Sequence, residues 1–111
     1  KNVDKKDIVQ LSKELMDISE RARNKQLLID ELKGGTFTIS NLGGIGGSFF
    51  TPIINPPEVA ILGVSRTKIK NNGKLTLPLS LSYDHRVIDG AAGAAFVVLL
   101  SNVLSNAKKL K

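Results

Sequence analysis

The sequence contains no cysteine and only one histidine, His85, in 111 residues. The lack of cysteine excludes disulfide scaffolds, thiol nucleophiles and cysteine-ligated zinc or iron–sulfur sites, and a single histidine excludes zinc sites built from several imidazoles. We therefore expect no metal site. No apolar run approaches the roughly 18 residues of a membrane span and no signal-peptide pattern opens the chain, so we expect a soluble intracellular protein without membrane contact.

Aromatic residues are also scarce, with four phenylalanines, one tyrosine and no tryptophan. The net charge of +6 comes from scattered basic residues and a short basic tail, Lys108, Lys109 and Lys111. Nucleic-acid-binding proteins gather arginine and lysine on a stripe, and single-strand binders interleave them with aromatic residues. Neither pattern is present, so we expect no nucleic-acid partner. The length supports one domain or part of one.

The spacing of apolar residues predicts an amphipathic helix over residues 5–23. One face collects apolar side chains every three or four positions, at Ile8, Leu11, Leu15, Ile18 and Ala22. Asp4 is the expected N-cap, and Asp17 and Arg21 are spaced to form an ion pair. The helix is expected to end near Asn24, a residue type that tolerates a left-handed C-cap.

Strict alternation over residues 36–40 predicts a half-buried strand. Phe37 and Ile39 point to the expected core, and Ser40 lies on the opposite, polar face. The glycine-rich segment 43–47 follows. It lacks the Gly-Lys-Ser/Thr of a P-loop, and prolines rather than a helix come next, so we interpret it as a tight loop and not as a nucleotide site.

Two further strands are predicted around a turn. Residues 59–64 form a continuous apolar run, which is typical of a strand covered on both faces. The turn residues 71–73 (Asn-Asn-Gly) predict that strands 59–66 and 75–83 are antiparallel neighbours. Pro78 cannot donate a hydrogen bond to a ladder, so it is expected at an edge or a bulge.

The segment after the last predicted strand holds most of the candidate chemistry. Residues 84–88 form a short connection, and Asp89 is expected to cap a final helix over residues 90–107. His85 follows the strand directly, where a rigid element can aim an imidazole that accepts a proton near neutral pH. The alternative is an ordinary surface or core histidine. Ser40 is the second candidate, either as a donor to a developing oxyanion or as a plain strand serine.

Three segments resemble one enzyme family, the acyltransferase components of 2-oxo acid dehydrogenase complexes, and most closely those of pyruvate dehydrogenase complexes. They are residues 34–43 (Gly-Gly-Thr-Phe-Thr-Ile-Ser-Asn-Leu-Gly), residues 50–64 with their Pro-Pro-Glu-Val-Ala, and residues 77–91 with Asp-His-Arg-Val-Ile-Asp-Gly. The resemblance implies that residues 1–111 are the C-terminal portion of the catalytic domain. It also implies the α/β (α+β) chloramphenicol-acetyltransferase-like two-layer sandwich, with a mixed sheet flanked by helices.

The resemblance further implies roles for individual residues. His85 is the general base toward the thiol of coenzyme A, Ser40 donates to the oxyanion, and Asp89 holds the histidine loop in shape, a role that its capping function does not exclude. Asp84 and Arg86 are read as structural, and Gly90 as a site of close packing. Residues that contact coenzyme A are not assigned.

Partners and location also follow from the resemblance. A homotrimer would place each site between two chains and build a cubic or icosahedral core. The lipoyl group, and the contacts to the pyruvate dehydrogenase and dihydrolipoamide dehydrogenase components, would lie on domains outside this chain. Such a complex is cytoplasmic in bacteria and in the mitochondrial matrix in eukaryotes.

Other functions remain open at this point. They are a non-catalytic oligomerising fragment, a transferase for succinyl or branched-chain acyl groups, and a chloramphenicol-type acetyltransferase, against which segments 34–40 and 56–60 argue.

Overall fold

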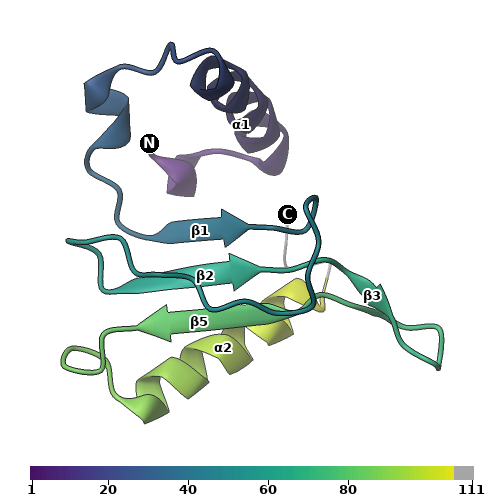
Figure 1. Cartoon of the computed structure of the whole chain (residues 1–111). Coiled ribbons are helices and arrows are strands. Elements are labelled where there is room, and N and C mark those ends of the chain that lie inside the picture. Colours follow the sequence, from purple (N-terminus) through teal and green to yellow (C-terminus); the bar gives the residue numbers. More distant parts are fainter. Residues whose placement is uncertain (107–111) are drawn as a thin grey trace. The chain divides into compact units, whose positions relative to one another are not determined.

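The computed structural model describes residues 1–106 and divides into two compact units, one formed by residues 1–34 and 99–106, the other by residues 35–98. The predicted order of helix, three strands and helix is found, with two short 3-10 helices and a small hairpin in addition (Figure 1). Each unit is described by itself below. The basic tail falls outside the described residues.

The first unit contains the 3-10 helix η1 (Val3–Lys5), helix α1 (Ile8–Arg23) and the 3-10 helix η2 (Ile29–Leu32). The predicted N-cap of α1 is wrong. Asp7, not Asp4, caps it, because Asp7 accepts the amide of Gln10 at 2.8 Å while the Gln10 side chain accepts the amide of Asp7 at 3.2 Å. This reciprocal capping box starts the helix at Ile8.

Helix α1 ends at the predicted position, but the residue with left-handed backbone torsions is not the predicted one. Asn24 is the C-cap but has φ −85°, and the positive φ of 57° falls on Lys25. Arg21 donates to Asp17 at 2.9 Å as predicted, and it also forms two bonds to Glu31 at 2.8 and 2.9 Å. Arg21 therefore joins α1 to η2. The predicted apolar face is largely uncovered, since Ile8 and Leu15 are 63% and 67% exposed.

The second unit is built on a mixed three-stranded sheet. Strand β2 (Ala60–Val64) lies in the centre, parallel to β1 (Thr38–Asn41) and antiparallel to β5 (Leu79–Tyr83). Within β2, Ala60, Ile61 and Leu62 are at most 8% exposed and form the core. The predictions of a central apolar strand and of its antiparallel neighbour are confirmed.

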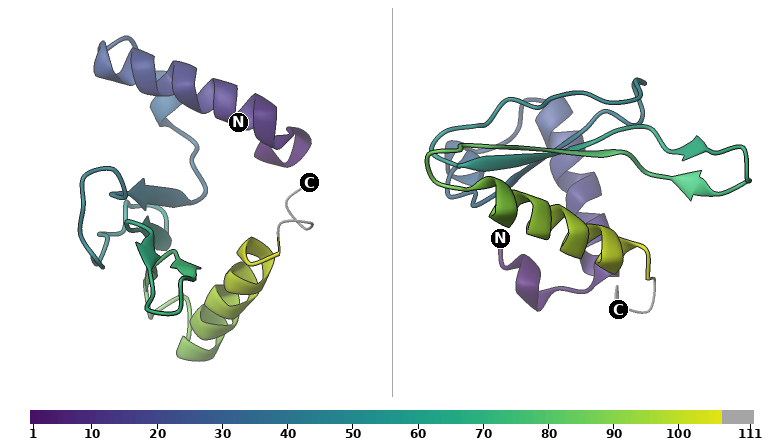
Figure 2. Two further views of the ribbon diagram at one scale, coloured as in Figure 1. Left: turned by 90° about the vertical axis from the view of Figure 1, so that its right-hand side faces the viewer. Right: turned by 90° about the horizontal axis from the view of Figure 1, so that it is seen from below.

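Helix α2 (Gly90–Leu104) covers one face of this sheet with its first turns (Figures 1 and 2). Phe96 of α2 packs against Phe37, with ring centroids 6.0 Å apart. The helix ends three residues before the predicted limit, and residue 107 lies outside the described part. A mixed sheet with a covering helix agrees with the predicted fold class.

The burial of β1 differs from the prediction. Ile39 is 63% exposed, whereas Thr38 and Ser40 on the other face are half-buried. Phe37 meets α2, but this cover ends before Ile39. On the polar face the hydroxyl of Thr38 donates to Glu58 at 2.6 Å, so this half-buried hydroxyl has a hydrogen-bond partner.

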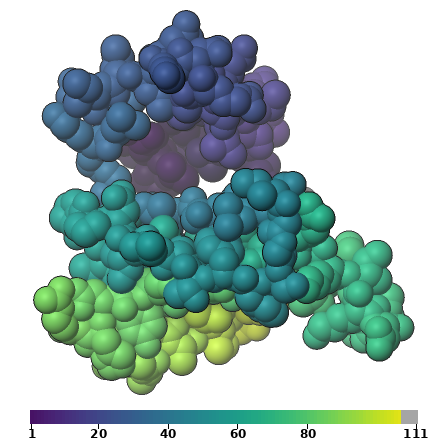
Figure 3. All heavy atoms as spheres, viewed as in Figure 1, coloured from purple at the N-terminus to yellow at the C-terminus, as the bar shows by residue number. Residues whose placement is uncertain are grey.

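The predicted strand 75–83 is interrupted at Leu77 and Pro78. Its first part, β4 (Leu75–Thr76), pairs with β3 (Lys68–Ile69) in a separate hairpin around the predicted turn, and only β5 joins the main sheet. Pro78 lies in the break, where its carbonyl accepts the amide of Ser65 at 3.1 Å. Figure 3 shows the hairpin standing away from the rest of its unit.

The glycine-rich segment forms a tight loop, as expected. Gly46 and Gly47 have φ values of +132° and +91°, which residues with a Cβ rarely adopt. Arg66 binds the carbonyls of Gly43 and Gly44 at 3.1 and 3.3 Å and fixes the loop to the chain after β2. No helix in residues 1–106 is long and apolar enough to cross a membrane.

Candidate active site

The loop that carries His85 is anchored through the backbone of Asp84. The amide of Asp84 donates to the carbonyl of Val59 at 2.8 Å. This bond continues the pairing of β5 with β2 by one residue beyond the end of each strand. The carbonyl of Asp84 accepts the amides of Val87 and Ile88, both at 3.0 Å. These bonds close a turn over residues 84–88. His85 stands exposed on this turn, one residue beyond the anchoring aspartate.

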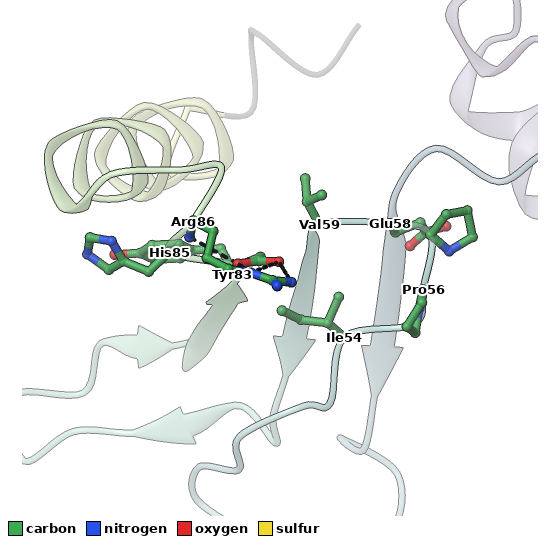
Figure 4. A pocket seen from close by; sticks show the side chains of 9 residues that line it. Ile54, Pro56, Glu58, Val59, Tyr83, His85 and Arg86 are labelled. Carbon is green, nitrogen blue, oxygen red and sulfur yellow. Dashed lines mark hydrogen bonds and ion pairs between the residues drawn. The ribbon is translucent and has the colours of Figure 1, made fainter.

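An ion pair stiffens the same turn from its outer side. The guanidinium of Arg86 contacts the Asp84 carboxylate at 2.6 Å, and the amide of Arg86 donates to it at 3.0 Å (Figure 4). The side-chain bonds from Arg86, then the backbone bond, lower the pKa of Asp84 to about 2. The same pair raises the pKa of Arg86. Both residues therefore shape the loop, as the sequence predicts.

The imidazole of His85 lies beside the phenol ring of Tyr83, with ring centroids 5.7 Å apart and planes tilted by 40°. Both side chains point away from Ile54 and Val59, toward the side where α2 begins (Figure 4). A Cβ on Gly90 would lie 3.9 Å from Nε2 of His85 and 4.0 Å from the hydroxyl of Tyr83. The start of α2 thus lies close to the candidate base.

Gly93 is a site residue that the sequence analysis missed. A Cβ at this position would come within 2.8 Å of the Tyr83 ring, closer than real Cβ atoms approach, and within 3.2 Å of its hydroxyl, which is a tight contact. Gly93 is also the one buried residue of α2. The available signal was a lone glycine inside the alanine-rich run 91–95. Close packing was predicted at Gly90, where the contact is of ordinary length.

Asp89 acts on the start of α2. Its carboxylate accepts the amide of Ala92 at 2.7 Å, which confirms the predicted N-cap. Within residues 1–106 this carboxylate makes no hydrogen bond or ion pair with the turn 84–88. Asp89 therefore influences His85 through the position of the helix rather than by a direct bond to the loop.

Ser40 lies far from His85 in the same chain. In the sheet register Ser40 is level with Gly63, whereas Tyr83 is level with Ala60 and Asp84 is bonded to Val59, directly before the turn that carries His85. Strand spacing and rise then place the backbones of Ser40 and Asp84 about 10 Å apart across the sheet and about 13 Å apart along it. The structure brings Tyr83, His85 and the capped start of α2 together, and leaves Ser40 at the opposite end.

The largest cavity near the turn has a volume of about 620 Å³. It is lined on one side by Ile54, Pro56, Pro57 and Glu58, and on the other by Tyr83 and the start of the turn. His85 belongs to this lining together with Asp84 and Arg86, and its ring points away from Ile54 and Val59 (Figure 4). No group of three or more histidine, aspartate or glutamate side chains in the described residues is arranged to hold a metal ion.

Comparison with known proteins decides the family. The model for the 2-oxoacid dehydrogenases acyltransferase catalytic domain matches residues 1–111. The chain belongs to this family. It is 61% identical over 113 aligned residues to the dihydrolipoyllysine-residue acetyltransferase component of the pyruvate dehydrogenase complex from Buchnera aphidicola subsp. Acyrthosiphon pisum, and 54% identical over 117 to that of Haemophilus influenzae. The alignments cover 96% and 99% of this chain, but 28% and 21% of those relatives.

Solved structures of the family share the fold. A structure of Azotobacter vinelandii dihydrolipoamide acetyltransferase aligns with a TM-score of 0.91 at 49% identity, covering 99% of this chain and 48% of that one. It comes from a study of a serine, a histidine and, four positions after the histidine, an asparagine in the catalytic mechanism of that enzyme. The cubic core of a pyruvate dehydrogenase multienzyme complex aligns with a TM-score of 0.90 at 48% identity, covering 98% of this chain and 48% of that one. The chain thus spans less than half the length of these relatives.

Proposed function

We propose that this chain is the C-terminal portion of the catalytic domain of a pyruvate dehydrogenase complex acetyltransferase. In this role it transfers an acetyl group between S-acetyldihydrolipoamide and coenzyme A. The observation that carries the proposal is His85, held exposed on a turn that is braced by Asp84, Arg86 and Tyr83. The names of the bacterial relatives supply the acyl group and the complex.

The reaction needs a base because a free thiol, with a pKa of about 8.5, is mostly protonated near neutral pH. His85 takes the proton of the coenzyme A thiol as the sulfur attacks the thioester carbonyl. The new carbon–sulfur bond forms and the carbonyl oxygen becomes an oxyanion. When the intermediate collapses, the bond to the dihydrolipoamide sulfur breaks and His85 returns the proton to that sulfur. A positioned base contributes roughly 10²–10⁴-fold to such a step.

Ser40 is proposed as the hydrogen-bond donor to this oxyanion, supplied by a neighbouring chain. Its separation from His85 within one chain supports a site shared between protomers, because both groups must reach the same carbonyl. Removal of one oxyanion donor costs about 3 kcal/mol of transition-state stabilisation in other enzymes. Asp89 stands four positions after His85, where the Azotobacter vinelandii enzyme has the studied asparagine, and its proposed role is to fix the start of α2 beneath the site.

The proposed assembly is a homotrimer that builds a cubic or icosahedral core. Exposed apolar side chains support it, among them Ile8, Leu15, Ile45 and Ile53 at 63%, 67%, 85% and 88% exposure. The lipoyl group and the contacts to pyruvate dehydrogenase and dihydrolipoamide dehydrogenase belong to other domains. In a bacterium this function places the chain in the cytoplasm.

The decisive substitution is His85→Ala in the assembled enzyme that contains this chain. Acetyl transfer from acetyl-CoA to dihydrolipoamide is expected to fall by about 10²–10⁴-fold, because the thiol loses its base. Arg23→Ala, at an exposed position in the other unit, is the matched control. Unchanged transfer in His85→Ala would contradict the proposed mechanism.

A second candidate, a scaffold that only oligomerises, is favoured by the same exposed apolar side chains. Sedimentation of the unsubstituted chain together with a transfer assay separates the two functions. Assembly without acetyl, succinyl or branched-chain transfer supports the scaffold, whereas transfer by the assembled chain excludes a purely structural role.

A further inference from the structure

We propose that Tyr83 is a positioning residue for His85, and that Gly93 is glycine so that Tyr83 can occupy this position. In this arrangement helix α2 contacts the phenol ring, and the phenol ring contacts the imidazole. Nε2 of His85 then lies close to Gly90. The inference rests on the proposed function for its kinetic consequence, but its structural content is independent of that function.

The backbone of Tyr83 is fixed at the end of the sheet. Tyr83 is the last residue of β5 and pairs with Ala60 of the buried central strand. The next residue, Asp84, donates its amide to Val59 at 2.8 Å, so the backbone on both sides of the Tyr83 Cα is tied to the core. Because the rotamers open to a side chain depend on its backbone torsions, a fixed backbone also limits where the phenol ring can lie. The phenol ring is therefore well placed to act as a rigid support.

The Tyr83 ring contacts helix α2 at Gly93. The Tyr83 ring occupies the space into which a side chain at position 93 would project, with its Cε1 and Cζ at 2.8 and 3.0 Å from an ideal Cβ. Glycine lowers the stability of a helix interior relative to alanine, and the positions on both sides of Gly93 are alanine. Helix propensity therefore favours alanine at position 93, and the close contact with the Tyr83 ring explains why glycine is found there instead.

The Tyr83 ring also contacts the imidazole of His85. The Tyr83 and His85 rings are 5.7 Å apart and tilted by 40°, within the range of interacting aromatic pairs. The exposed imidazole lacks a hydrogen-bond partner within residues 1–106, so this ring contact and the start of α2 are what restrict it. Reacting groups that shift by about 1 Å lose up to about 100-fold in rate. Moving the phenol ring should therefore move the base.

The test uses the fact that His85 is the single histidine of residues 1–111, so histidine labelled with ¹³C at Cε1 gives one imidazole signal in this chain. Tyr83→Leu removes the aromatic ring, Gly93→Ala displaces it, and Tyr83→Phe keeps it without the hydroxyl. Ala94→Ser adds one atom at the next, exposed position of α2 and is the matched control. The same variants are assayed for acetyl transfer in the assembled enzyme, with kcat and KM determined across pH.

We expect Tyr83→Leu and Gly93→Ala to shift the imidazole signal, and Tyr83→Phe and Ala94→Ser to keep it close to that of the unsubstituted chain. In the assay, Tyr83→Leu and Gly93→Ala should lower kcat by about 10- to 100-fold with KM changed less than about twofold, and Tyr83→Phe should recover most of the kcat lost in Tyr83→Leu.

Two results would overturn the inference. One is an imidazole signal that does not move in Tyr83→Leu, and the other is a Tyr83→Phe variant as impaired as Tyr83→Leu, which would assign the effect to the hydroxyl. Should Gly93→Ala fail to fold, the two Tyr83 variants still decide. Should the unsubstituted enzyme transfer no acetyl group, the proposed function fails while the imidazole signal still tests the positioning.

Discussion

The turn that carries His85 and the imidazole itself are held by two different kinds of contact, an ion pair and ring packing. On the solvent side, Asp84 and Arg86 form an ion pair in which the Arg86 side chain is 89% exposed. Exposed pairs add little to global stability because water and salt screen them. On the helix side, Tyr83 is wedged between His85 and Gly93. Packing of this kind depends on shape and is insensitive to salt.

The ion pair makes a prediction about pH. Arg86→Ala should raise the pKa of Asp84 from about 2 toward its ordinary 3.8, because the guanidinium bonds that lower it are lost. The folded-state pKa lies below the ordinary value, so the pair contributes at pH above that value and its contribution is lost as the pH falls through the folded pKa. Carboxyl NMR titration of Asp84 measures the shift. Because Arg86→Lys keeps a cation, it should give a smaller rise, and an unchanged Asp84 titration in Arg86→Ala would contradict the assignment.

At the scale of the elements, the start of α2 is set by its cap. Asp89→Ala should destabilise the chain by about 1 kcal/mol, because the amide of Ala92 loses its acceptor. Asp89→Asn keeps an acceptor and should stay close to the unsubstituted stability. Thermal unfolding of the three proteins measures this. If Asp89→Asn unfolds as early as Asp89→Ala, the carboxylate charge rather than the cap stabilises this region.

Sequence patterns predicted the elements that depend on their own residues. The apolar run 59–64 predicted the central strand, Asp89 predicted the start of α2, and the Asp17–Arg21 spacing predicted an ion pair within one helix. Such features are local, so periodicity and capping preferences describe them well.

Features that depend on several elements were not predictable in the same way. Asp4 and Asp7 are both suitable caps, and the reciprocal bond from Gln10 decides between them. The burial of β1 depends on how far α2 extends over the sheet, which leaves Ile39 uncovered. The Tyr83–Gly93 contact joins a strand end to a helix interior, and neither residue alone indicates the other.

At the scale of the whole molecule, the proposed chemistry requires more than one chain. His85 follows the end of β5 and Ser40 lies near the end of β1, on opposite outer strands and at opposite ends of the sheet (Figure 1). Strand rise and spacing keep them more than about 15 Å apart. A histidine and a serine that act on one thioester must therefore come from neighbouring protomers.

The most direct test of this claim mixes two inactive proteins. His85→Ala and Ser40→Ala chains are prepared separately, dissociated, and reassembled in equal amounts, and acetyl transfer between acetyl-CoA and dihydrolipoamide is measured. If each site takes its histidine from one chain and its serine from the next, about a quarter of the sites regain both residues and activity rises well above either parent. Activity that stays at the level of the two parents would contradict a site shared between chains.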